Sequence, residues 1–298
     1  KAIGSNAYDN CKELKQIDDF VVGFTHGKMF KKMTEKNFKM SDKSVKDNSI
    51  ADDFIVVQAK AKSNQTLLAF TNLGNCCKID MEIAPECRFR DKGHKFNAVA
   101  KEVARNEYPI AFFAVDEGKL PDGHLLFFTK DGLIKKTALT EFASIRKVGK
   151  IAISIVEGDE LISVQLTSGD NEIILASHEG KCIRFSETDV RAMGRDTQGV
   201  KSMDISDGDY IIDMSVGKEN SEVITMTENG FGKRSSLDDY RQQNRGGKGV
   251  KAGVFNAKTG KLASLKLATE DQDIMIITSN GTIIRVASSD ISKIGRDT

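Results

Sequence analysis

The sequence contains no tryptophan, only three prolines and only four histidines among its 298 residues. Ring-shaped repeat proteins of the WD40 class carry a recurring Trp-Asp pair, so the absence of tryptophan argues against that class. The histidines are too scattered to predict a metal cluster. The longest uninterrupted apolar run, Ile110–Val115, is far too short to cross a bilayer, so we expect no membrane segment in this sequence.

Motifs that mark a self-contained active site are also missing. Five cysteines form an odd set with no C-x-x-C pair, which is typical of reduced thiols. Neither the phosphate-binding pattern G-x-x-x-x-G-K-[ST] nor the nucleophile pattern G-x-S-x-G occurs. Residues 247–252 fit G-x-G-x-x-A, but they lie among β-type segments with no helical pattern after them, which argues against a dinucleotide site. We therefore expect no catalytic residue, metal or cofactor in this sequence.

What the sequence does contain is a repeat. An apolar run ends in Thr or Ser, a glycine follows two or three positions later, and a basic residue stands four positions after the glycine. Six copies occur, with glycines 47, 58, 48, 50 and 51 residues apart, and the first copy is one residue shorter in the turn. The pairs are Gly27 and Lys31, Gly74 and Lys78, Gly132 and Lys136, Gly180 and Arg184, Gly230 and Arg234, and Gly281 and Arg285.

Each copy has the chemistry of a β-hairpin. Glycine supplies the positive φ of a tight turn, and the preceding run is rich in Val, Ile, Leu, Phe and Thr. A further apolar run precedes most hairpins and another follows a Gly-rich segment, which gives about four strands in roughly 50 residues. A single small sheet cannot bury both of its faces, so six such units predict an all-β, propeller-like ring of four-stranded blades.

The repeat also divides the chain. We expect one domain over residues 18–298, with blades starting near residues 18, 52, 108, 159, 207 and 260, after a linker or closing segment over residues 1–17. Phe96–Lys101 contains helical spacing, but its place in the repeat predicts the fourth strand of a unit. Residues 295–298 stop partway through a motif that is complete at residues 194–200. We therefore expect a last blade without its final strand, and either an open, spiral-like ring or closure by residues 1–17.

The net charge is only +1, but the charges are segregated within the repeat. Acidic residues cluster just before the first strand or hairpin of a unit, as at Asp18-Asp19 and Asp52-Asp53. Basic residues cluster in the Gly-containing corner after the hairpin, and residues 241–251 hold four basic residues and no acid. Equivalent corners occupy equivalent places around a ring, which predicts one basic rim and one acidic band. Lys, Arg and backbone N–H groups bind phosphate oxygens without reading bases, so such a rim predicts sequence-nonspecific binding and bending of duplex DNA.

One corner carries a more specific string. Gln243-Asn-Arg-Gly-Gly-Lys-Gly249 resembles the GyrA box, Q-R-R-G-G-K-G, at six of seven positions, with Asn244 in place of Arg. Residues 130–142, 190–195, 230–234 and 294–298 look like the same family, the C-terminal domain of bacterial DNA gyrase A and its topoisomerase IV counterpart. The resemblance implies a six-bladed β-pinwheel whose outer rim wraps DNA and presents it to the strand-passage core of a type II topoisomerase.

The resemblance also implies partners and a location. These are duplex DNA, the remainder of the gyrase A polypeptide and the B-type ATPase subunit of a heterotetramer, in the bacterial cytoplasm at the nucleoid. The cleavage tyrosine, ATP and Mg²⁺ belong to other parts of that enzyme. In gyrase the box normally lies in the first blade, whereas here the first-blade corner, residues 37–45, is basic but lacks Gly-Gly-Lys. The choice between gyrase and topoisomerase IV as the parent enzyme therefore stays open.

The predicted DNA contacts come from the corners and from the basic repeat positions. They are Gln243, Asn244, Arg245, Gly246, Gly247, Lys248, Gly249, Lys31, Lys32, Lys36, Lys39, Arg90, Lys147, Arg191, Arg195, Lys233, Arg234 and Arg296. The alternative function is a propeller scaffold that binds other proteins through its faces, which would show little affinity for DNA.

Overall fold

The computed structural model describes residues 17–42, 53–116, 119–143, 150–217 and 221–298. These residues form six antiparallel sheets, numbered I to VI along the chain. Sheet I contains β1 (Asp19–Thr25), β2 (Met29–Thr34), β3 (Ile55–Lys62) and β6 (His94–Lys95), and sheet II contains β4 (Thr66–Thr71), β5 (Asn75–Asp80), β7 (Pro109–Val115) and β10 (Lys150–Ile151). Sheet III contains β8 (His124–Thr129), β9 (Leu133–Ala138), β11 (Leu161–Thr167) and β14 (Val200–Lys201), and sheet IV contains β12 (Glu172–Ser177), β13 (Lys181–Ser186), β15 (Ile211–Gly217) and β18 (Val250–Lys251). Sheet V contains β16 (Glu222–Thr227), β17 (Gly232–Ser236) and β19 (Leu262–Ala268), and sheet VI contains β20 (Asp273–Ile277) and β21 (Ile283–Ala287).

The four-stranded sheets are assembled from separated parts of the chain. A hairpin forms the centre of each sheet, the next long strand along the chain forms its inner edge, and a two-residue strand forms its outer edge. The two-residue strand is added only after the chain has built the following hairpin, as when β6 returns to pair with β2 after β4 and β5. β10, β14 and β18 return to the preceding sheet in the same way. Neighbouring sheets are therefore interlocked by an exchanged strand.

The pairing of the long inner strands corrects the predicted blade boundaries. The predicted starts near residues 52, 108, 159, 207 and 260 fall just before β3, β7, β11, β15 and β19. Each of these strands pairs with the hairpin that precedes it in the chain, not with the hairpin that follows. The prediction of four strands per repeat is confirmed for sheets I to IV, but a sheet and a continuous stretch of sequence do not coincide.

The hairpin turns use the repeated glycine as predicted, with one correction. In five copies the glycine N–H donates to the carbonyl of the Thr or Ser three residues earlier, and the glycine φ lies between 80° and 87°. In the first copy Lys28, not Gly27, has this place, with a φ of 62° and its N–H 2.9 Å from the Thr25 carbonyl. The basic residue equivalent to Lys136 is therefore Lys32 rather than Lys31, because the turn begins one residue later than the glycine suggests.

The core is divided among the interfaces between neighbouring sheets. Within the described part of the chain, four apolar clusters follow one another, and each draws on two neighbouring sheets. Between sheets II and III, for example, the ring of Phe70 meets those of Phe127 and Phe142 edge-on, with centroids 5.5 and 5.2 Å apart. Full burial of such a side chain stabilises the fold by about 1.5–3 kcal/mol. These interfaces therefore hold the sheets side by side.

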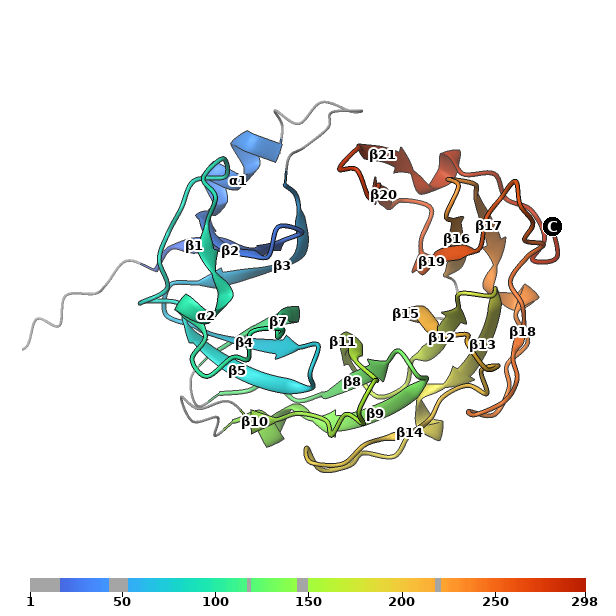
Figure 1. The fold of residues 1–298 in the computed structure, drawn as a ribbon, viewed down its shortest axis with the longest axis horizontal. Helices are drawn as coiled ribbons and strands as arrows, with labels where there is room; N and C mark the ends of the chain where they lie inside the picture. Colours follow the sequence, from blue (N-terminus) through green and yellow to red (C-terminus); the bar gives the residue numbers. More distant parts are fainter. Residues whose placement is uncertain (1–16, 43–52, 117–118, 144–149, 218–220) are drawn as a thin grey trace, which may run out of the picture.

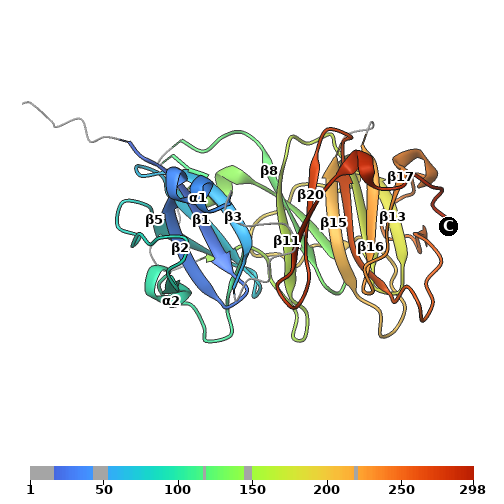
Figure 2. The same cartoon turned by 90° about the horizontal axis from the view of Figure 1, so that it is seen from above.

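The six sheets lie along an arc, with sheets I and VI at its two ends (Figure 1). Seen after a 90° turn, the strands cross the thickness of the arc (Figure 2). Among the described residues, sheet V has no outer-edge strand, and sheet VI has only its hairpin. The ribbon does not close between β3 and the β20–β21 hairpin, in keeping with the open alternative for the predicted all-β pinwheel (Figure 1). The predicted linker or closing role of residues 1–17 falls almost wholly on residues outside the described part of the chain.

Two short helices depart from the repeat. The predicted fourth strand at Phe96–Lys101 is wrong: the outer strand is β6, and it is followed by the four-residue helix α2 (Phe96–Val99), as the helical spacing of this segment indicates. The helix α1 (Glu35–Asp42) packs beside β1 and β2. The other helical segments of the described residues are short 3-10 turns, η1 (Leu139–Phe142), η2 (Glu187–Asp189), η3 (Leu237–Asp239) and η4 (Ser288–Asp290). Among the described residues, no helix is long and apolar enough to span a membrane.

Candidate nucleic-acid interface

Three equivalent loops, here called the corner loops, run along the outer side of the arc (Figure 1). They cover residues 190–199, 240–249 and 291–298, and each follows the 3-10 turn after a hairpin. Each loop crosses to the preceding sheet and hydrogen-bonds to its basic repeat residue. The amides of Met193, Gln243 and Ile294 donate to the carbonyls of Lys136, Arg184 and Arg234 at 2.8–2.9 Å. The corner loops therefore occupy equivalent places on successive sheets, as the repeat predicts.

An arginine at the same place in each corner loop ties that loop one sheet further back. The Nη1 of Arg195 donates to the Ile151 carbonyl at 3.1 Å, and Arg245 and Arg296 donate in the same way to the carbonyls of Lys201 and Lys251. These carbonyls belong to the outer strands β10, β14 and β18. Each corner loop thus contacts three consecutive sheets. The three arginines are half-buried, so their first role in this structure is to position the loops.

A buried lysine supports two of the three corner loops from below. The Nζ of Lys135 donates to the carbonyls of Ala152 at 2.8 Å and Thr197 at 3.2 Å, and Lys233 donates to those of Gly295 at 3.3 Å and Thr298 at 2.9 Å. Burial lowers the pKa of Lys135 to about 8 and also lowers the pKa of Lys233. Beneath these two loops, the ammonium group of a strand lysine is therefore directed at main-chain carbonyls and not at solvent.

The box-like corner loop, residues 240–249, rests on an apolar floor instead. The residue equivalent to Lys135 in sheet IV is Ile183, which is fully buried. The Gly246 N–H donates to the Ser202 carbonyl at 2.8 Å, with Gly246 at a φ of 82°. Gly249 has a φ of 71°, and a Cβ there would lie 2.4 Å from the Cys182 carbonyl oxygen. Gly246 and Gly249 are thus required by the backbone path, which lies close to sheet IV.

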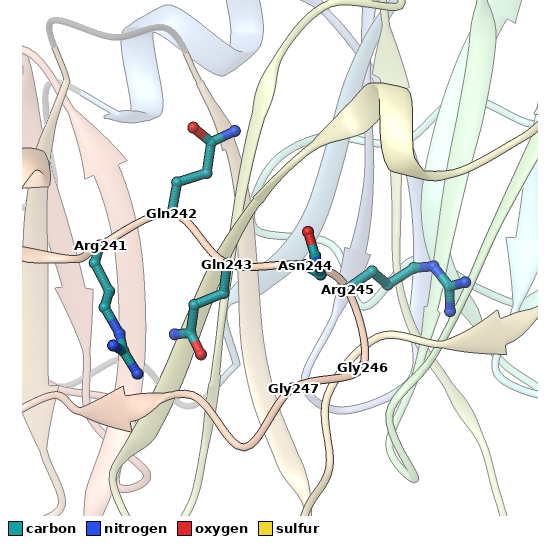
Figure 3. Close-up of a pocket in the computed structure, with 7 residues that line it drawn as sticks. All are labelled: Arg241, Gln242, Gln243, Asn244, Arg245, Gly246 and Gly247. Carbon is teal, nitrogen blue, oxygen red and sulfur yellow. The ribbon is translucent and has the colours of Figure 1, made fainter.

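The charge of this loop is directed outward. Arg241, Lys248 and Lys251 are exposed, and residues 241–251 contain no acid. The neighbouring corner loops carry exposed Asp196 and Asp297 where the box-like loop has Gly246. Residues 241–247 line a shallow depression of about 500 Å³, and the side chains of Arg241 and Arg245 extend from this segment in different directions (Figure 3). This is the most basic corner loop among the described residues, and two consecutive residues of its backbone, Gly246 and Gly247, carry no side chain.

Four of the predicted DNA contacts point inward. Lys31, Lys32, Lys233 and Arg234 are at most 9% exposed, which makes the prediction of an exposed charge at these positions wrong. The Nζ of Lys32 donates to the carbonyls of Met81 at 2.7 Å and Ala84 at 3.1 Å, and Lys31 donates to Phe89 at 2.8 Å. These carbonyls lie beyond the following hairpin, so the basic residues connect neighbouring sheets.

The same inward role extends along the repeat. Arg234 bonds to Glu222 at 2.7 Å and to the Ile291 carbonyl at 3.3 Å. Arg184 bonds to Glu172 at 2.7 Å and to the Leu237 carbonyl at 3.0 Å. In these copies the basic residue of the hairpin supports the fold, since it satisfies the carbonyls of a turn from the next sheet.

The remaining predicted contacts are distributed over the arc. Lys36, Lys39, Arg90 and Arg191 are exposed, and Lys39 forms an ion pair with Glu35 at 2.8 Å. Lys147 lies outside the described residues. The structure brings Gln243, Asn244, Arg245, Gly246, Gly247, Lys248 and Gly249 together on one loop, as their sequence requires. Their contact with DNA remains a prediction.

The predicted single acidic band is wrong. Asp53, Asp159 and Asp209 lie at the hairpin-turn end of the sheets, where each carboxylate accepts a turn N–H at 2.8–3.0 Å. Asp19 lies at the opposite end of the antiparallel pair β1–β3, opposite Lys62. Antiparallel strands begin at opposite ends of a sheet, so acids that precede different strands cannot form one band. The turn acids support the hairpins instead.

Comparison with known proteins gives the chain its relatives. The family described as DNA gyrase C-terminal domain, beta-propeller, matches residues 123–168, 171–218, 221–269 and 272–298. The DNA gyrase A protein of Halalkalibacterium halodurans is 52% identical over 83% of this chain and 29% of its own length. The DNA gyrase A proteins of Ureaplasma parvum and Staphylococcus aureus are 32% and 35% identical over 99% and 96% of this chain. The chain spans about a third of the length of these relatives (29%, 35% and 33%).

Two solved structures share the fold. A crystal structure of the C-terminal domain of DNA topoisomerase IV aligns with a TM-score of 0.80 at 24% identity, over 96% of this chain and 88% of that one. A structure of a DNA gyrase A C-terminal domain aligns with a TM-score of 0.71 at 22% identity, over 94% of this chain and 93% of that one. The similarity extends well beyond the segments that the family matches, since it includes the first sheets.

Proposed function

Because the chain belongs to the DNA gyrase C-terminal domain family, a β-propeller family, we propose that its outer rim binds and bends duplex DNA for a type II topoisomerase. The observation that carries this proposal is the box-like corner loop, which has three basic residues, no acid and two consecutive glycines on the outer side of the arc. Cationic side chains donate hydrogen bonds to phosphate oxygens, and glycines let a phosphate approach the backbone closely. The loop suits the DNA backbone rather than the bases.

The arrangement of the corner loops supports bending as well as binding. Bending a site of 20–30 base pairs through 40–90° costs about 1–6 kcal/mol, so several contacts spaced along the curve must offset that cost. The three corner loops stand at equivalent places on successive sheets of an arc. DNA that follows the outer side of the arc meets them one after another. The box-like loop makes the strongest contact, because its two neighbours carry an exposed aspartate each.

The parent enzyme in this proposal is DNA gyrase. The full-length relatives that share 32–52% identity with the chain are DNA gyrase A proteins. In the complete enzyme the rim would present a DNA segment to the cleavage core of gyrase A, with the B-type protein supplying ATP hydrolysis. Reconstitution of full-length gyrase A with its B-type partner tests the assignment. We expect ATP-dependent negative supercoiling of relaxed plasmid, whereas relaxation or decatenation without supercoiling would favour topoisomerase IV.

A salt titration tests the DNA rim directly. If the rim contacts about 6–10 phosphates, log K for a long duplex should fall with log salt at a slope of roughly −5 to −9, whatever the DNA sequence. Fluorescence anisotropy at several salt concentrations measures this slope. A slope near −1 would show that the corners do not act together. Negligible affinity at low salt would overturn the proposal and leave the protein-binding scaffold as the function.

A further inference from the structure

Four lysines lie in or beside the box-like loop, and three of them interact with a single carboxylate, that of Asp204. Strand pairing places Lys181 directly opposite Lys251, because β13 pairs with β18. Asp204 donates its N–H to the Gly247 carbonyl at 2.8 Å, and its carboxylate forms an ion pair with Lys201. That ion pair lowers the pKa of Asp204, and the charges of Lys248 and Lys181 lower it further. We call Lys181, Lys201, Lys248 and Lys251 the lysine cluster.

The cluster is poorly balanced by the rest of the protein. Two carboxylates that line the same depression as Lys181 and Lys251 already have partners, since Glu179 pairs with Lys261 and Glu228 with His178. Within the described ranges, no acid lies within 4.0 Å of the ammonium groups of Lys181 and Lys251, and the only carboxylate in an ion pair with the cluster is that of Asp204. Like charges directly opposite each other on paired strands destabilise a sheet. The lysine pair is therefore a feature that folding alone does not favour.

The feature is confined to the sheet that carries the box-like loop. At the same place in sheet II, Asn75 faces Ile151, and in sheet III, Leu133 faces Lys201. In sheet I, Met29 faces Lys95. Among the described outer-edge pairs, two lysines therefore face each other only in sheet IV. The sequence does not predict Lys181 as a DNA contact, because Lys181 directly follows the hairpin glycine and lies outside every basic corner.

We propose that the lysine cluster seats backbone phosphates of duplex DNA, and that Asp204 competes with those phosphates for Lys201 until DNA displaces it. The inference rests on the proposed function. It adds a second phosphate-binding site next to the box-like loop, and the protein's own Asp204 lowers the affinity of that site for DNA. A carboxylate and a phosphate oxygen accept the same N–H donors, so Asp204 occupies Lys201 in the free protein. The side chain of Asp204 is 40% exposed and that of Lys201 is 58% exposed, which leaves both free to separate.

Neutralising the competitor tests the proposal. In the full chain, Asp204→Asn should bind a duplex about three- to tenfold more tightly than the parent at fixed salt, and its salt slope should steepen by about one, since Lys201 becomes available for one more phosphate. Asp207→Asn is the matched control, because Asp207 is an exposed carboxylate three residues further along the chain. Equal gains in the two variants would show a general charge effect and overturn the competitor role. No gain in Asp204→Asn would overturn it as well.

Removing one lysine of the facing pair tests the seat by a separate measurement. Lys181→Gln and Lys251→Gln should each raise the melting temperature without DNA, because they remove the repulsion across β13–β18. The same variants should weaken duplex binding about threefold or more and flatten the salt slope by about one. Variants that bind DNA like the parent would overturn the seat, whatever their stability.

Two further comparisons separate the possible failures. Inorganic polyphosphate in place of duplex distinguishes a general polyanion seat from one that needs the spacing of DNA phosphates. We expect the effect of Asp204→Asn to be larger for duplex, and an equal effect on both would overturn the assignment to DNA. A parent protein with no duplex affinity would reject the proposed function itself. A parent with a steep salt slope that none of these variants alters would reject only this inference.

Discussion

At the scale of single residues, the place of a basic side chain in the repeat decides what it does. Lys32, Lys136, Arg184 and Arg234 stand at equivalent strand positions and turn into the protein. Arg241 and Lys248 stand in a loop on the outer side and remain exposed. Arg245 is intermediate, because it bonds to the Lys201 carbonyl while lining the depression of the box-like loop. Charge alone therefore does not identify a DNA contact.

This distinction predicts different outcomes for neighbouring residues of the box-like loop. Lys248→Ala removes an exposed charge and should change the free energy of unfolding by less than about 0.5 kcal/mol. It should weaken duplex binding and flatten the salt slope by about one. Arg245→Ala should cost about 1 kcal/mol of stability, since it also removes the hydrogen bond to the Lys201 carbonyl. Thermal unfolding and fluorescence anisotropy measure the two effects; an Arg245→Ala variant of unchanged stability would contradict the positioning role.

The buried Lys135 predicts a pH dependence with a defined sign. Its folded-state pKa of about 8 lies below its ordinary value of 10.5, so the unfolded chain binds this proton more tightly. The free energy of unfolding should therefore rise from about pH 8 to about pH 10.5, and this contribution is lost as the pH falls through 8. Lys135→Met should lack it. Urea unfolding at several pH values checks this, and a parent-to-variant difference that stays constant across the window would refute it.

At the scale of the elements, the corner loops depend on a backbone path that only glycine permits at some positions. Gly249 combines a φ of 71° with a carbonyl oxygen 2.4 Å from where a Cβ would stand. Gly158 has a φ of 91° with nothing within 4 Å of that position. The two glycines thus separate conformational strain from steric overlap. A side chain at Gly249 of the box-like loop would meet both conformational strain and steric overlap, whereas one at Gly158 would meet only the strain.

Substituting these two glycines should give unequal losses. Gly158→Ala should lower the free energy of unfolding by about 1 kcal/mol, from conformational strain alone. Gly249→Ala should lower it by about 2–5 kcal/mol, because the methyl group also displaces β18 from the Cys182 carbonyl. Chemical unfolding of both variants, followed by circular dichroism, measures the losses. Equal losses would show that the loop can move away from sheet IV.

The elements also show how far the sequence can be interpreted. Hairpins are local, so their apolar runs and turn glycines predict six of them correctly, and the corner string follows from its own residues. The repeat also predicts a strand after each Gly-rich segment, but it does not reveal that these two-residue strands pair with the hairpin of the preceding sheet. The sequence predicts Lys32 as a DNA contact because it belongs to the basic first-blade corner, whereas the carbonyls that bury it follow another hairpin. The features that the sequence does not predict are therefore non-local.

At the scale of the whole molecule, stability should vary along the arc. Sheets I to IV have an inner and an outer strand on either side of the hairpin, whereas sheet VI consists of β20 and β21 alone among the described residues. Its apolar residues are also less buried, with Met275 49% exposed, whereas Ile173, Ile174 and Leu175 of β12 are fully buried. Open edges and thin burial lower the free energy of local opening. Sheet VI should be the first to open.

Hydrogen exchange tests this order. Amides of β20 and β21 should exchange at least about tenfold faster than those of β8 and β12, in line with an opening free energy lower by about 1.4 kcal/mol or more. Mass spectrometry of exchanged peptides resolves the two regions. Uniform exchange along the arc would mean instead that the sheets open as one cooperative unit.

The strand exchange has a mechanical consequence. A corner loop is joined to three consecutive sheets through main-chain hydrogen bonds, a guanidinium and an outer strand, so a tension applied to it is shared among them. A pull directed along the outer strand would load the bonds of that strand together in shear, rather than peeling them apart one at a time. A stiff polymer bent over the outer side would exert that kind of load, and the overlap of each sheet with the next would pass it along the arc. The outer side of the arc should therefore resist, as one connected unit, a load that would separate the strands of a single sheet.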